Sequence, residues 1–179
     1  MASVVFFRAV NVGGHQKFQP SVLARQLADF DIVNVGAAGT FVVRENVAQA
    51  RLREEILRRL QFKPELMICS AGDVCALVRC GPSHGKAVDA GVGQFVSVLQ
   101  KALRVLPRLP LDQPAGGKWE VRIIDVVGKF VLSLRRPGRT GVYSNAVVEK
   151  HLGMPATTRG WNTIKSVCAI LGERDLARG

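Results

Sequence analysis

The sequence lacks the features that mark membrane proteins and secreted proteins. No apolar stretch in its 179 residues approaches the length of a membrane-spanning helix. The apolar start, MASVVFFRAVNV, is short and is interrupted by Arg8. It has neither the basic beginning nor the small-residue cleavage site of a signal peptide. We therefore expect a cytoplasmic protein without a membrane segment.

Cysteine pairs with the spacing C-x-x-C are also absent. The four cysteines are Cys69, Cys75, Cys80 and Cys168, and we expect reduced thiols because nothing suggests secretion. Cys75, Cys80 and His84 match no zinc pattern, so small apolar residues on a helix and in its following loop are favoured over a metal site. The sequence predicts neither a metal nor a cofactor.

Enzyme signatures are weak. The stretch NVGGHQK is neither a Walker loop nor a G-x-G-x-x-G fingerprint, although Gly13 and Gly14 with Lys17 can form a small anion-binding loop. A plain strand-to-helix connection is the alternative. His15, in the same loop, is the best general-base candidate, but no nucleophile accompanies it. The catalytic residues are unknown, and the sequence does not decide whether the protein is an enzyme.

Positive charge is the strongest compositional signal. The chain has 25 Lys and Arg against 14 Asp and Glu, a net charge of +11 and a pI of about 10.3. From Lys129 to Lys165, seven basic residues accompany one acidic residue, so this segment supplies more than half of the net charge. The concentration indicates a polyanionic partner, and a solvated basic surface is the alternative. The candidate basic face comprises Lys129, Arg135, Arg136, Arg139, Lys150 and Lys165.

The hydrophobic share of 47% suffices for one compact domain or for two small lobes. Residues 1–70 alternate strand and helix patterns in the order β-α-β-β-α-β, which is the plan of ferredoxin-like folds. Ala38-Gly39 predicts a tight turn between the two middle strands, and Asn46 with Gln49 predicts a capping box at the second helix. The expected strands span 3–12, 31–38, 40–45 and 64–70, and the first helix spans 19–30.

Residues 71–179 predict a second, looser α+β lobe. A helix over 71–80 and a strand over 94–100 precede the clearest hairpin, 118–134, which turns near Gly128. Ser144 is expected to cap a short helix that ends at Gly153. The expected fold class is α+β, a two-lobed two-layer sandwich.

The stretch from His151 to Leu171, HLGMPATTRGWNTIKSVCAIL, has two interpretations. In the structural one, Thr158 is the N-cap of a helix that ends at Gly172, with a buried stripe of Trp161, Ile164, Cys168 and Leu171. In the functional one, the same helix start, with two threonines and Arg159 beside it, holds a phosphate or carboxylate. The sequence leaves both open.

Three stretches carry a resemblance to a known family. They are FFRAVNVGGHQKF from Phe6, AAGTFVV from Ala37 and LGMPATTRGWNTI from Leu152. In this order, the chain resembles the family of domains of unknown function numbered 1697, whose members typically carry LLRGINVGG, QSGNVVF and LGxPATTRNWNTV. The resemblance implies a two-lobed α+β fold and no particular activity.

The resemblance also selects candidate ligand-binding residues. This chain departs from the family pattern at Ala9, Ala38, Thr40 and Gly160, which implies weaker or different binding if those positions contact a ligand in relatives. We further expect Arg8 to point toward Thr157–Arg159, so that the first and last motifs share one anion-binding cleft. The matching positions that become candidates are Arg8, Asn11, Thr157, Thr158, Arg159, Trp161 and Asn162, and the loop residues Gly13, Gly14 and Lys17 complete the set.

Three classes of function follow from these patterns. The leading hypothesis is binding of a phosphate-bearing ligand, either a nucleic acid or a nucleotide-like phosphorylated small molecule, at a basic cleft. A small-molecule enzyme acting on an anionic substrate is the first alternative. A protein-interaction module with a basic face is the second. The sequence does not predict an oligomeric state.

Overall fold

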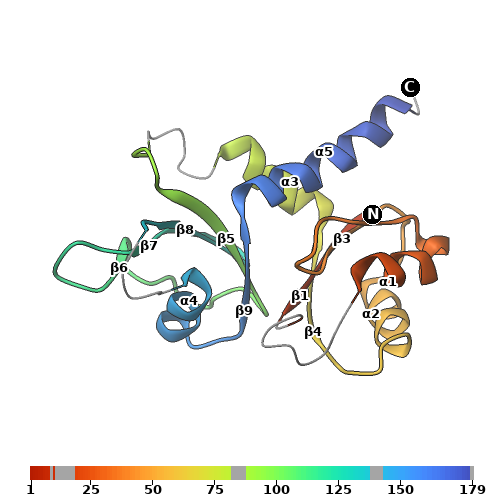
Figure 1. Cartoon of the computed structure of the whole chain (residues 1–179), viewed down its shortest axis with the longest axis horizontal. Helices are drawn as coiled ribbons and strands as arrows, with labels where there is room; N and C mark the ends of the chain where they lie inside the picture. Colours follow the sequence, from red (N-terminus) through yellow and green to blue (C-terminus); the bar gives the residue numbers. More distant parts are fainter. Residues whose placement is uncertain (9, 11–18, 82–87, 138–142, 178–179) are drawn as a thin grey trace. The chain divides into compact units, whose positions relative to one another are not determined.

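The computed structural model describes residues 1–8, 10, 19–81, 88–137 and 143–177. Two compact units emerge: Met1–Arg79 with Thr163–Gly179, and Cys80–Asn162. The division falls later than the one predicted after residue 70, because the helix that follows this residue joins the first unit. Each unit contains an antiparallel sheet and helices, which confirms the α+β class (Figure 1).

The first unit has the ferredoxin-like topology that its sequence predicts. Its sheet order is β2-β3-β1-β4, and every neighbouring pair is antiparallel. The two strands of each β-α-β unit are therefore parallel and have one other strand between them, as in a split β-α-β fold. The elements are β1 (Ser3–Arg8), α1 (Pro20–Gln26), the 3₁₀ turn η1 (Ala28–Phe30), β2 (Ile32–Asn34), β3 (Thr40–Val43), α2 (Gln49–Arg58), β4 (Glu65–Ser70) and α3 (Ala71–Cys80).

Helices α1 and α2 cover the same face of this sheet (Figure 1). Between them and the sheet lie fully buried side chains, among them Leu23, Phe41 and Leu52. The rings of Phe7 and Phe41 lie 5.3 Å apart at the centre of the layer. The predicted Ala38-Gly39 turn is confirmed, and Gly39 has φ +69 beside Phe7, whose backbone N donates to its carbonyl over 2.8 Å.

The predicted capping box at α2 is wrong. The helix begins at Gln49 with Ala48 as its N-cap, and no side chain caps it. The carboxamide oxygen of Asn46 instead accepts a hydrogen bond from the N-terminal amine of Met1. A charged donor competes better for this oxygen than a neutral backbone N–H does.

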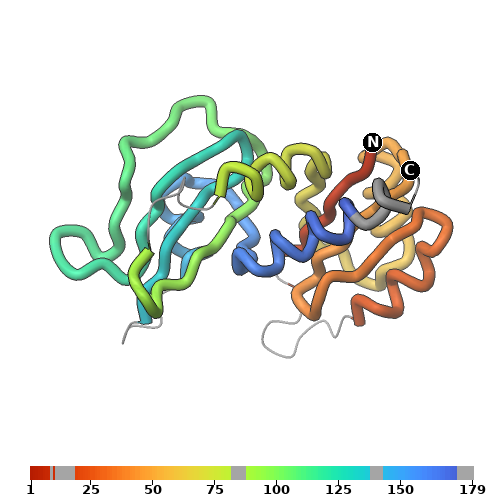
Figure 2. Tube along the Cα trace, turned by 90° about the horizontal axis from the view of Figure 1, so that it is seen from above, coloured from red at the N-terminus to blue at the C-terminus, as the bar shows by residue number. Residues whose placement is uncertain are grey.

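The second unit is a five-stranded antiparallel sheet with α4 on one face (Figure 1). The strand order is β6-β7-β8-β5-β9. Figure 2 shows the extended excursion between β5 and β6, in green, which the prolines keep from forming a long helix. The elements are β5 (Gly93–Leu99), β6 (Leu111–Gln113), β7 (Val121–Val127), β8 (Phe130–Arg135), α4 (Ser144–Leu152) and β9 (Ala156–Gly160).

The final helix, α5 (Trp161–Ala177), begins immediately after β9. The structure corrects two expectations about it. Thr158 is not its N-cap, because Ala156–Gly160 pair with β5 as a strand. Gly172 does not end the helix, which continues to Ala177. The predicted stripe is partly confirmed, since Trp161 and Ile164 are buried while Cys168 and Leu171 are half-buried.

In the part of the chain that the structure describes, no helix is both long enough and apolar enough to cross a membrane.

Candidate functional site

The candidate site lies in the second unit, between α4 and the sheet. Cross-strand partners share a face, so the pairs Ser97 with Thr158 and Phe95 with Ser133 project from the same side of the sheet. Val131, on that side, packs in the same core as Val147 and Val148 of α4. The hydroxyl groups of the two strand serines and Thr158 therefore face the layer beneath the helix. We call Ser97, Ser133, Ser144 and Thr158 the hydroxyl layer.

A directed hydrogen-bond chain crosses this layer. Thr158 Oγ1 donates to Asn145 Oδ1 over 3.0 Å, and it lies 2.6 Å from Ser97 Oγ. A hydroxyl has one proton to donate, so Ser97 must be the donor in the second bond. In this series of hydrogen bonds, the amide oxygen of Asn145 is the final acceptor. The two N–H groups on Nδ2 remain as donors, and no described residue accepts from them.

Two members of the hydroxyl layer have no hydrogen-bond partner. The side-chain oxygens of Ser133 and Ser144 are buried and unpaired, in residues that are 1% and 3% exposed. Ser144 lies three and four positions before Val147 and Val148, the other buried residues of α4, so it shares their sheet-facing side. Buried hydroxyls are usually hydrogen-bonded, which makes an unpaired couple in one layer a feature that needs an explanation.

The start of α4 adds further donors. The helix has Tyr143 as its N-cap and no side-chain capping bond, so the predicted cap by Ser144 is wrong. Ser144 occupies the first helical position instead, where its hydroxyl points into the layer. The N–H of Val147 bonds to the Tyr143 carbonyl over 3.3 Å. The N–H groups before it have no acceptor within the helix, and this end carries partial positive charge.

An arginine and an aromatic ring mark the rim of the site. The Arg135 guanidinium lies 4.7 Å from the ring centroid of Tyr143, which is 65% exposed. Arg135 is on the same sheet face as Ser133, two residues away along β8. Gly160 faces the same side beside Phe95, and no described atom lies within 4 Å of where its Cβ would be. Among the described residues, the space at Gly160 is open.

The motif PATTRGW is split between the two faces of the sheet. Thr158 faces α4, whereas Thr157 and Arg159 project from the opposite face. There Arg159 Nη1 donates to Thr157 Oγ1 over 2.8 Å and to the Thr158 carbonyl over 2.9 Å. Burial lowers the pKa of Arg159 to about 10. Trp161 is buried and Asn162 is exposed, both at the start of α5.

The first motif lies in the first unit. Arg8 is paired with Glu65, directly across from it on β4, over 3.0 Å. The shared cleft between Arg8 and Thr157–Arg159 stays a prediction, because the two motifs belong to different units. The candidates Asn11, Gly13, Gly14 and Lys17 lie outside the described residues, as do His15 and His84.

Within the second unit, the predicted basic residues that the structure describes do not gather around one point. Arg135 and Arg136 lie at the end of β8, and Lys129 lies in the turn before the strand. Lys129 and Arg135 are six positions apart along the strand, about 20 Å at the usual rise. Lys150 is in the last turn of α4, away from Ser144, and Lys165 belongs to the first unit. Arg139 lies outside the described residues.

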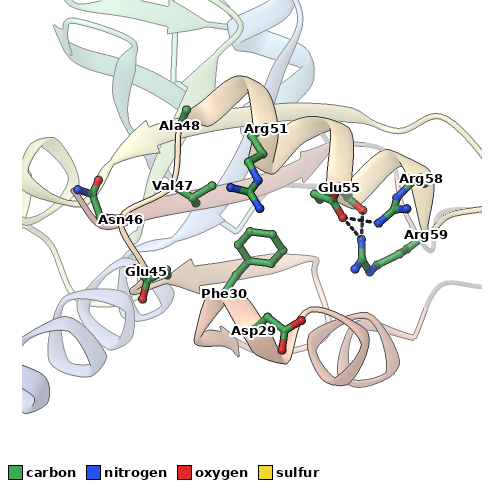
Figure 3. Close-up of a pocket in the computed structure, with 10 residues that line it drawn as sticks. All are labelled: Asp29, Phe30, Glu45, Asn46, Val47, Ala48, Arg51, Glu55, Arg58 and Arg59. Atoms are coloured by element: carbon green, nitrogen blue, oxygen red, sulfur yellow. Dashed lines mark hydrogen bonds and ion pairs between the residues drawn. The ribbon is translucent and has the colours of Figure 1, made fainter.

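A hollow of about 510 Å³ in the first unit is the other candidate (Figure 3). The Arg51 guanidinium lies 6.0 Å from the Phe30 ring centroid in its wall. Beside it, Glu55 pairs with Arg59 and with Arg58, which lowers the pKa of the Glu55 carboxyl. The remaining lining groups include the acidic side chains of Asp29 and Glu45. Its charges are mixed and largely exposed, so its chemistry favours no particular ligand.

No group of described residues has the composition of a metal site. The Cys168 thiol is also a poor ligand or nucleophile, because burial and the neighbouring Cys75 raise its pKa to about 12.

Sequence reasoning missed Ser97, Ser133 and Asn145. A signal for the serines was present, because each interrupts an apolar strand, in QFVSVLQ and KFVLSL. In a strand, every second residue faces the same side, so Ser97 shares a face with the apolar residues Phe95 and Leu99. This places its hydroxyl on a core-facing side. A polar group at such a position predicts a buried hydrogen-bonding site.

Comparisons with known proteins bear on the fold and the family. A solved structure from Streptococcus pneumoniae, the conserved bacterial protein SP0830, is similar with a TM-score of 0.61. The similarity covers 95% of this chain and 98% of that one at 17% identity, which shows a common fold. No curated protein matches the chain. The family model for the protein of unknown function DUF1697 matches residues 1–125, so the chain belongs to the DUF1697 family.

Proposed function

We propose that the second unit binds a phosphate-bearing ligand at the start of α4. The observation that carries the proposal is an excess of hydrogen-bond donors over acceptors at this end of the helix. The Nδ2 group of Asn145 and the N–H groups of the first turn, which have no acceptor within the helix, donate and cannot accept. The Arg135 guanidinium beside Tyr143 adds positive charge. Such a set complements an anion.

Phosphate suits this set better than carboxylate does. A phosphate group presents more acceptor oxygens and more negative charge, and arginine and helix N-termini both favour it. The exposed Tyr143 ring, stacked with Arg135, offers a surface for a planar group attached to the phosphate. Both a nucleic acid and a nucleotide-like molecule combine these two chemical features.

The test is calorimetric titration of the full chain with two probes at about 50 mM salt, where phosphate contacts are strong. One probe is adenosine 5′-monophosphate, and the other is a single-stranded oligonucleotide without terminal phosphates. The proposal requires that at least one binds. Salt dependence then separates a ligand with many phosphate contacts from one with a single contact, since the first gives the steeper slope.

Asn145→Asp is the informative variant. It keeps an oxygen that accepts from Thr158, but it replaces the Nδ2 donors with a negative charge. We expect binding to fall by at least about tenfold, because a donor to a charged group is lost and repulsion is added. Gln100→Glu is the matched control, since it makes the same charge change at an exposed position of the same unit. Equal losses in the two variants, or no binding by the wild type, would overturn the proposal.

A further inference from the structure

We infer that the ligand is a small phosphomonoester, whose terminal phosphate enters the layer beneath α4 and is bound by Ser133 and Ser144. This inference rests on the proposed function and extends it, because it names the class of ligand. It follows from the unpaired hydroxyls of Ser133 and Ser144. An anion bound only at the helix N–H groups would leave both hydroxyls without a partner.

The two hydroxyls come from elements that face each other across one layer. Ser133 projects from β8 toward α4, and Ser144 projects from the first turn of α4 toward the sheet. Both oxygens are buried and neither has a partner among the described residues. Both hydroxyls can donate, and the neighbouring Asn145 amide and helix N–H groups donate as well. An acceptor-only group bound in this layer can take hydrogen bonds from both hydroxyls.

A bridging water can also satisfy both hydroxyls, because each serine oxygen accepts as well as donates. What a phosphate adds is negative charge, which water lacks and which the start of α4 favours. The terminal phosphate of a monoester has three unesterified oxygens, carries a charge of about −1.5 to −2 at neutral pH, and donates little.

Burial also selects a terminal phosphate over an internal one. An internal phosphodiester continues into the nucleic-acid chain on both sides, so it needs two routes out of the layer in which Ser133 and Ser144 are buried. A monoester has a single substituent, which can leave toward the rim, where Phe95 is half-buried and Tyr143 is exposed. The open space at Gly160 lies on the same face.

The variants that test this inference are Ser133→Ala and Ser144→Ala, alone and combined. Removing a buried hydroxyl that has no partner relieves a desolvation cost, so the ligand-free protein should keep or raise its melting temperature. Ser97→Ala is the matched contrast. Its hydroxyl is used in the bond to Thr158, so its loss should lower the melting temperature.

The experiment combines thermal unfolding with titration of adenosine 5′-monophosphate into the full chain. We expect the monophosphate to bind the wild type and to raise its melting temperature, whereas adenosine does neither. In the double alanine variant, affinity should fall by about tenfold or more while the ligand-free melting temperature does not fall.

Three results would overturn the inference, and they are distinguishable from failure of the proposed function. Binding of the oligonucleotide but not of the monophosphate would leave the proposed function standing and remove this ligand class. Equal affinity of the wild type and the double alanine variant would place the phosphate elsewhere. A fall in the ligand-free melting temperature of that variant would show that the hydroxyls are structural. Binding of neither probe would reject both proposals together.

Discussion

Thr158 and Asn145 are joined by a 3.0 Å hydrogen bond that fixes β9 to the first turn of α4. The bond also decides which end of the Asn145 amide faces away from Thr158. Because the oxygen accepts from Thr158, the Nδ2 donors are left for the start of the helix. The orientation of one carboxamide therefore connects the sheet to the chemistry of the proposed site.

Thr158→Val should break this connection while keeping the shape of the side chain. It removes a donor to Asn145 and an acceptor for Ser97, so we expect a loss of about 1–3 kcal/mol in the free energy of unfolding. Phosphomonoester binding should weaken as well, because the amide is released. Denaturant titration and calorimetry on the same preparation measure both. A variant as stable as the wild type would mean that the chain Ser97–Thr158–Asn145 is not formed.

The hairpin turn in the first unit gives a stability prediction with an internal control. A Cβ on Gly39 would lie 2.8 Å from Phe7 Cβ, whereas a Cβ on Gly36 would meet nothing within 4 Å, and both glycines have positive φ. Gly36→Ala should therefore cost only the backbone penalty of about 1–2 kcal/mol. Gly39→Ala should cost a further 1–3 kcal/mol, roughly, for overpacking. Equal midpoints in urea titrations of the two variants would contradict this packing.

The ion pair between Asp112 and Arg122 should make the free energy of unfolding depend on pH. Arg122 holds the Asp112 carboxylate through two bonds, of 2.6 and 2.7 Å, and so lowers the pKa of this carboxyl from 3.8. A lowered folded-state pKa gives stability that is fully present above the unfolded value and is lost as the pH falls through the folded one. The wild type should exceed Asp112→Asn in stability at neutral pH, by less than about 1 kcal/mol because the pair is partly exposed.

The pH series for this pair is simple to read. The difference in free energy of unfolding between the wild type and Asp112→Asn should shrink as the pH falls below about 4, near the ordinary value for aspartate. A difference that stays constant from neutral pH to pH 3 would show that the carboxylate contributes through packing instead.

Trp161 supplies a prediction for the start of α5. The side chain is 9% exposed, and replacing a buried large aromatic residue by alanine costs about 3–5 kcal/mol. Lys165→Ala, an exposed position on the same helix, should change stability by less than about 0.5 kcal/mol. Should Trp161→Ala cost under about 1 kcal/mol, the ring would be a solvent-facing platform and not part of a core.

The ferredoxin-like unit was predictable because local and global signals agree there. Apolar runs such as SVVFF and ELMIC form strands that are buried over most of their length, and Leu52 and Ile56 recur at helical spacing. The hairpin around Gly128 was predictable for the same reason. In these segments, the periodicity of apolar residues directly follows the geometry of burial.

The strand β9 could not be predicted in the same way. ATTRG is short and largely polar, and threonine is typical both of strands and of helix N-caps. Its identity comes from pairing with β5, where Thr158 lies opposite Ser97, some sixty residues earlier in the chain. The apolar strands around Ser97 and Ser133 indicate that both serines are buried, but the long-range pairing that brings Thr158 beside Ser97 leaves no local pattern.

The central claim, that phosphate binds at the start of α4, is tested most directly by amide chemical shifts of the full chain labelled with ¹⁵N. Adenosine 5′-monophosphate is titrated in, and the shift of each backbone N–H is followed. We predict the largest changes at the N–H groups of Ser144, Asn145 and Ala146, because these point at the bound anion. Changes confined to the first unit, such as around Arg51 and Arg59, or no changes at all, would contradict it.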